Sequence, residues 1–157
     1  MLIHRRTSPF EVIYLKKVVD SHSSNPPNPE YSIENYTSSE RFPFEDDALS
    51  EGIKRNSVFQ QASITPLHNY AVAMDNDWTF SIDYAVKNIY KNGVFVKKEY
   101  QIKRYINQEV FDFEKDAQKT MSEKISNFNS AGLYVISSAI YEISNGYSFW
   151  IDYIEKN

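Results

Sequence analysis

Apolar and polar residues alternate along residues 70–106. The even-numbered positions are mostly apolar and the odd-numbered positions between them are mostly polar. A period of two is typical of strands that bury one face against a core. The pattern predicts a three-stranded antiparallel meander over residues 70–74, 78–86 and 94–106.

Two polar segments, 75–77 and 91–93, separate these strands. Since all three strands share one parity, we expect an odd number of residues in each turn, and therefore two three-residue loops. Gly93 suits a left-handed position in the second loop. In this register Ile82 would lie opposite Ile102.

From Glu109 onward the period of the apolar positions changes to three and four, which predicts one amphipathic helix packed on the meander. Gly132 is placed to end it. The apolar positions of this helix are Val110, Phe113, Ala117, Met121, Ile125 and Phe128.

A C-terminal β-hairpin is predicted for residues 133–143 and 147–155, around the polar segment 144–146. Unlike the meander, this hairpin has apolar residues at both parities, so both of its faces need cover. We interpret the surplus face as a candidate partner-binding surface, unless residues 20–61 fold over it. Its members are Tyr134, Ile136, Ile140, Trp150 and Ile154.

The first third of the chain has a weaker pattern. Residues 10–19 are apolar at both parities, which predicts an additional N-terminal strand. Residues 20–45 are rich in Ser, Asn and Pro and are expected to form a long polar loop, after which Asp46 or Asp47 could cap a short helix. The predicted fold is therefore α+β, in a single domain over residues 1–157.

Composition excludes several classes of function. The 157 residues are 41% hydrophobic and 15% aromatic, which is enough for one folded core. With no cysteine, disulfides, thiolate zinc sites and Cys nucleophiles are excluded. The net charge of -4 makes nucleic acid an unlikely partner. No apolar run approaches a membrane span, so we expect a cytoplasmic protein with no membrane contact.

Catalytic motifs are missing from the sequence. There is no glycine-rich phosphate loop, no Gly-x-Ser-x-Gly elbow and no His-Glu-x-x-His helix, and the three histidines are scattered. We therefore expect no cofactor and no metal.

One alternative concerns the polar face of the meander. In the predicted register Asp83 lies across from Gln101, with Glu99 and Lys103 beside them, and such a group could hold a divalent ion. A metal-dependent nuclease of the restriction-endonuclease-like type uses an Asp on one strand and a Glu-x-Lys on the next. Here Gln101 stands in the usual Lys position and Lys103 lies beyond it.

The preferred hypothesis is a non-enzymatic protein that acts through protein contacts, either with a protein partner or by self-association. An inhibitor, an immunity protein and a phage-type accessory or virion-assembly component all belong to this class. The bias toward Ile, Asn, Lys and Tyr codons suggests a bacterial or phage genome.

Overall fold

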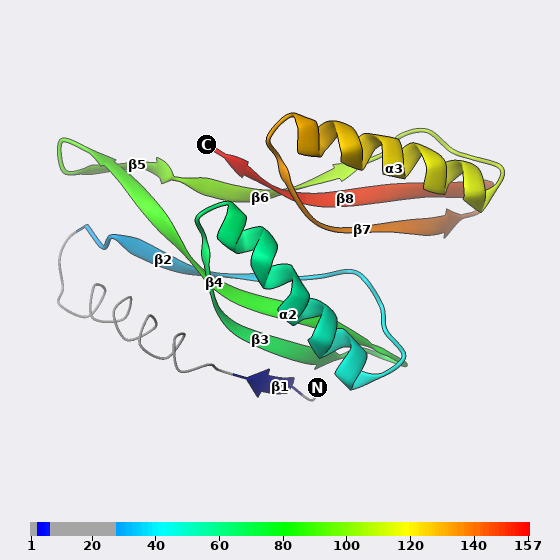
Figure 1. Cartoon of the computed structure of the whole chain (residues 1–157), viewed down its shortest axis with the longest axis horizontal. Helices are drawn as coiled ribbons and strands as arrows, with labels where there is room; N and C mark the ends of the chain where they lie inside the picture. Colours follow the sequence, from blue (N-terminus) through cyan, green and yellow to red (C-terminus); the bar gives the residue numbers. More distant parts are fainter. Residues whose placement is uncertain (1–2, 7–27) are drawn as a thin grey trace. The chain divides into compact units, whose positions relative to one another are not determined.

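The computed structural model describes residues 3–6 and 28–157, with side chains from residue 28 onward (Figure 1). The described chain is α+β and contains two antiparallel sheets and two helices. It divides into two compact units, Met1–Tyr100 with Asn157, and Gln101–Lys156. Neither described helix is long and apolar enough to cross a membrane.

The first unit is a helix on an antiparallel sheet whose strand order is β1-β3-β4-β2, with β5 paired to the far end of β4. Helix α2 packs on β3 and β4 (Figure 1). The predicted strand over residues 10–19 lies outside the described residues. The elements are β1 (Ile3–Arg6), β2 (Tyr31–Thr37), α2 (Glu45–Gln61), β3 (Thr65–Ala73), β4 (Trp78–Lys91) and β5 (Val94–Lys98).

The second unit confirms the predicted amphipathic helix and the C-terminal hairpin. Helix α3 packs on β7 and β8, and the strand order is β6-β8-β7. Its elements are β6 (Tyr100–Ile106), α3 (Glu114–Ser130), β7 (Tyr134–Ile143) and β8 (Gly146–Lys156).

The two units are copies of one sequence. Residues 30–88 align with residues 99–157 without a gap, at a constant offset of 69, and 20 of the 59 pairs are identical. Identity on this scale in an ungapped alignment indicates a tandem internal duplication. The clearest matches are Phe42-Pro43-Phe44-Glu45 with Phe111-Asp112-Phe113-Glu114, and Phe80-Ser81-Ile82-Asp83-Tyr84 with Phe149-Trp150-Ile151-Asp152-Tyr153.

The structure follows the same offset. Strands β2 and β6, and helices α2 and α3, begin and end at equivalent residues. An isolated bridge joins Phe42 to Trp78 in the first copy and Phe111 to Tyr147 in the second. Each copy is therefore one strand-helix-hairpin unit with the same strand order. Residues 89–98, which form the end of β4 and all of β5, join the two copies.

The predicted pairing of the third meander strand is wrong. A meander is present as β3, β4 and β5, but β6 pairs with β8 rather than with β4. Residue Ile82 lies opposite Tyr36 and Asn69, not Ile102. The reason is β2, which forms within the supposed polar loop and occupies the edge of β4 that the prediction gave to residues 100–106.

The predicted turn lengths are also wrong. Lys91 pairs with Val94, so Asn92 and Gly93 form a two-residue turn, with φ of 53° and 77°. Positive φ at both positions is the requirement of a type I′ hairpin turn. In the C-terminal hairpin Ile143 pairs with Gly146, again leaving two residues in the turn. In the first hairpin Ala73 pairs with Trp78, which leaves four.

Each copy buries its own core between helix and sheet. In the first copy Phe59 and Phe80 are fully buried, and α2 comes so near β4 that a Cβ on Gly52 would lie 2.9 Å from the Cβ of Phe80. In the second copy Met121 of α3 packs with Phe149 and other residues of β8. Helix α2 is longer than the short helix predicted there.

Candidate functional site

In the predicted nuclease site, Asp83 lies on a strand that does not pair with the strand of Gln101 and Lys103. Asp83, on β4, lies opposite Asn35 and His68. Gln101 and Lys103 belong to β6, which pairs with β8. The strand pairing on which the nuclease hypothesis depended is therefore not formed.

Glu99 and Lys103, which also belong to the predicted nuclease site, make contacts with other residues. The backbone N–H of Glu99 donates to the carbonyl of Lys87 at 2.8 Å. Lys103 Nζ lies 2.9 Å from a carboxylate oxygen of Glu155, and this hydrogen bond raises the pKa of Lys103. Within residues 28–157, no group of three or more His, Asp or Glu is placed to hold a metal ion.

Asp83 is the centre of a hydrogen-bonded cluster on the sheet face that points away from α2. Its carboxylate accepts a hydrogen bond from Asn35 Nδ2 at 2.8 Å and another from the Tyr70 hydroxyl. His68 Nδ1 lies 3.6 Å from the same carboxylate. Because these donors already occupy much of the hydrogen-bonding capacity of the carboxylate, we interpret the cluster as one that stabilises the sheet.

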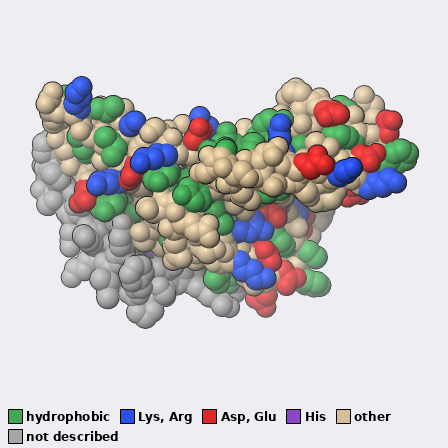
Figure 2. All heavy atoms as spheres, turned by 45° about the horizontal axis from the view of Figure 1, so that its top comes forward, with side chains coloured by type: hydrophobic (Ala, Val, Ile, Leu, Met, Phe, Trp, Pro, Cys, Tyr) green, Lys and Arg blue, Asp and Glu red, His purple; other side chains and the backbone are tan. Residues whose placement is uncertain are grey.

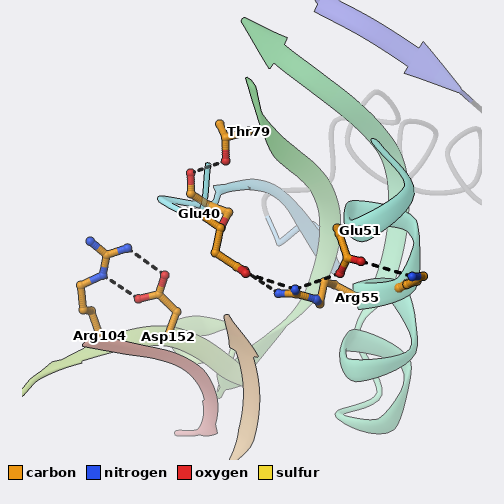
Figure 3. A network of polar contacts seen from close by, with 8 residues as sticks. Glu40, Glu51, Arg55, Thr79, Arg104 and Asp152 are labelled. Carbon is orange, nitrogen blue, oxygen red and sulfur yellow. Dashed lines mark hydrogen bonds and ion pairs between the residues drawn. The ribbon is translucent and has the colours of Figure 1, made fainter. Parts of the chain in front are cut away.

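The equivalent residue of the second copy, Asp152, supports this interpretation. It accepts two hydrogen bonds from Arg104, at 2.6 and 2.8 Å, and its side chain is only 3% exposed (Figure 3). The Arg104 guanidinium also lies 4.3 Å from the centre of the Trp150 ring. Arg104 occupies the position of Asn35, so the duplicated Asp accepts from the same neighbouring strand in both copies.

A second polar network fixes α2 in the first unit. Arg55 contacts Glu40 at 2.6 Å and Glu51 at 3.2 Å, and its guanidinium lies 5.3 Å from the centre of the Phe80 ring (Figure 3). Burial lowers the pKa of Arg55, but the hydrogen bonds that its guanidinium donates to Glu40 and Glu51, together with their negative charges, outweigh this and raise the pKa overall. The ion pairs of Arg55 with these two carboxylates therefore help to hold α2 in place.

The surplus face predicted for the C-terminal hairpin is not exposed. Ile136, Trp150 and Ile154 are buried, and Tyr134 is half-buried. Ile140 does not share their face, because it pairs with Phe149 and packs against the α3 core. The two-residue turn and a bulge between Val135 and Ser137 cause this change of register.

Exposed apolar side chains occur instead on β5. Val94, Phe95 and Val96 are 66%, 51% and 53% exposed. Among the described strands β5 pairs only with β4, so its other edge has no strand partner there. At the end of that edge Asn157 Nδ2 donates to the Lys98 carbonyl at 2.6 Å. The sequence pattern had assigned Val94 and Val96 to a buried face, and the lysines that follow them were the available sign of an exposed edge.

A second exposed set comes from the duplication. Phe44 and Phe113 are equivalent residues, immediately precede α2 and α3, and are 66% and 62% exposed. Both are N-cap residues whose side chains make no capping hydrogen bond. A Ser or Asp at an N-cap is worth about 1 kcal/mol more than a residue that cannot cap. The spacing of apolar residues predicts Phe113 on the buried face of the helix, whereas Phe113 precedes the helix and is exposed.

Figure 2 shows hydrophobic side chains at the surface, interspersed with charges of both signs rather than in one large patch. No protein-family model matches the chain, and comparisons with curated proteins and with solved structures find no match.

Proposed function

We propose that this chain is a non-enzymatic protein that acts through contact with another protein, and that β5 makes the contact. The observation that carries the proposal is the open edge of β5, with three successive exposed apolar side chains. An edge strand of this kind is a template on which a strand of a partner can add, because backbone hydrogen bonds supply affinity and the side chains supply specificity.

The charge of the hairpin favours a particular partner. Lys91 and Lys97 are exposed on it, and Lys98 pairs with Glu34, whereas the whole chain carries a net charge of -4. In a pair of antiparallel β5 strands, two lysine-rich hairpins would meet and repel each other. The proposed partner is therefore a different protein that offers an apolar edge strand flanked by Asp or Glu.

The test substitutes one exposed residue of β5. Val96→Glu should leave the circular dichroism spectrum and the melting temperature unchanged, since Val96 is exposed, but should weaken partner binding at least tenfold. Met74→Glu is the matched control, because Met74 is an exposed apolar residue outside β5. Proteins captured from the cells that make the chain are compared by quantitative mass spectrometry for the wild type and both variants, and the captured partner is then titrated.

Binding that survives Val96→Glu as well as it survives Met74→Glu would contradict the proposal. If Val96→Glu lowers the melting temperature, Phe95→Ser replaces it as the test variant. A wild-type dimer in light scattering that Val96→Glu converts to a monomer would mean that the occupant of the β5 edge is a second copy. The identity of the captured partner would separate the inhibitor, immunity and assembly roles.

A further inference from the structure

Phe44 and Phe113 have the same backbone setting in the two copies, although Lys115 Nζ lies 5.8 Å from the centre of the Phe113 ring and Asp46 takes the place of that lysine in the first copy. Their backbone angles nearly coincide, with φ of -123° in both and ψ of 143° and 139°. Each carbonyl accepts the first hydrogen bond of its helix, from Ala48 in one copy and from Ala117 in the other. Each ring is nevertheless largely in water.

Local divergence makes this retention informative. Three neighbours of Phe44 differ between the copies: Arg41 is replaced by Val110, Pro43 by Asp112 and Asp46 by Lys115. The exposed phenylalanine is retained beside these three changes.

Stability explains the other retained residues of this segment but not the phenylalanines. Ala48 and Ala117 are fully buried under their helices. Asp47 and Asp116 lie in the first helical turn, where acidic groups complement the helix dipole. An exposed Phe at an N-cap offers neither benefit. A residue that is unfavourable for the local structure, and that gives no stability in exchange, is typical of a functional position.

We propose that Phe44 and Phe113 are two copies of one aromatic anchor, and that each inserts into an apolar pocket with a basic rim on a protein partner. Aromatic rings, including phenylalanine, are enriched at the buried centre of protein interfaces. The basic rim follows from the exposed carboxylates of Asp47 and Asp116, which lie within the same first turn. Because the chain carries two such anchors, the partner presents the same pocket twice, as a homodimer or a repeat protein does, and binding gains from bivalency.

The first test needs no partner. Phe44→Ser and Phe113→Ser should each raise the melting temperature, because serine caps a helix and phenylalanine does not. The matched controls are Phe42→Ser and Phe111→Ser, which alter the bridging phenylalanines two residues earlier and should lower it. A fall in melting temperature for Phe44→Ser or Phe113→Ser would mean that the retained ring is structural, and would overturn the proposal.

The second test identifies the occupant. A photoreactive benzoylphenylalanine replaces Phe44 or Phe113 in the full chain, and the cells that make the chain are irradiated. The same protein should be cross-linked from both positions. Gln60 and Asn129 are the matched control positions, because they are equivalent, exposed and at the other end of their helices, and they should give no such adduct.

Titration of the purified partner completes the argument. Phe44→Ser and Phe113→Ser should each weaken binding by a similar factor of at least ten, and the double variant should weaken it further. Different adducts from the two positions, or no adduct from either, would overturn the proposal. Because β5 is intact in all these variants, the two proposals fail or succeed separately.

Discussion

The environment of Tyr84 makes the stability of the folded protein depend on pH. It is 7% exposed on β4, and its ring lies 5.2 Å from that of Phe59 under α2. Burial raises the pKa of Tyr84 to about 12, because the phenolate would lose its hydration. The folded protein therefore keeps this proton at a pH where the unfolded chain has released it.

This shift predicts a loss of stability in alkali. Below pH 10 both states hold the proton and the contribution of Tyr84 is intact, whereas between pH 10 and about 12 the free energy of unfolding should fall by about 2 to 3 kcal/mol. Urea titrations at pH 9, 10, 11 and 12 measure the loss, and Tyr84→Phe should remove this part of it. Equal alkaline losses in the wild type and in Tyr84→Phe would contradict the pKa shift.

At the scale of elements, the C-terminal ends of the two helices form the same motif with a different residue at its left-handed position. Both helices end in a Schellman motif: Ile64 N–H donates to the carbonyl of Phe59 at 2.9 Å, and Leu133 N–H to that of Phe128 at 3.0 Å. The residue before each donor adopts a left-handed conformation. It is Gly132 in the second copy, with φ of 78°, but Ser63 in the first, with φ of 62°.

Exchanging these two residues should change stability in opposite directions. A residue with a Cβ is disfavoured in the left-handed region, so Ser63→Gly should raise the free energy of unfolding by about 0.5 to 1 kcal/mol, and Gly132→Ser should lower it by a similar amount. Chemical denaturation of both variants gives the two values. A loss of stability on Ser63→Gly would show that the serine side chain has a compensating role.

The elements differ in how far the sequence could predict them. Helix α3 was predictable because its apolar residues recur every three or four positions. The hairpins were predictable because apolar runs flank short polar segments that favour turns. Strand β2 was not, since only Tyr31, Ile33 and Tyr36 indicate it within a polar, proline-rich segment. Turn length was inferred from parity alone, and in the second hairpin the bulge between Ile89 and Tyr90 invalidates that inference.

For the whole molecule, the decisive feature is the duplication. Its signal is present in the sequence as an ungapped match at an offset of 69. Searching for that match would have made residues 31–37 equivalent to the predicted strand at residues 100–106, and so would have predicted β2 inside the supposed polar loop. The duplication does not predict that the candidate contact residues are exposed, because an edge strand and a buried strand can show the same alternation of apolar and polar residues.

The duplication also predicts paired mutational effects. Phe80 and Phe149 are equivalent, and both are fully buried between helix and sheet. Phe80→Ala and Phe149→Ala should therefore each lower the free energy of unfolding by about 3 to 5 kcal/mol, measured by chemical denaturation. A large loss at one position with none at the other would mean that only one copy contributes to the measured transition.

The segment that joins the copies, residues 89–98, has a consequence for protein engineering. Its type I′ turn brings the end of one copy back toward the start of the next, so that Asn88 and Lys98 face each other across the hairpin. A reporter or binding peptide inserted between Asn92 and Gly93 would be displayed at an exposed tip and would leave the paired strands of both copies intact.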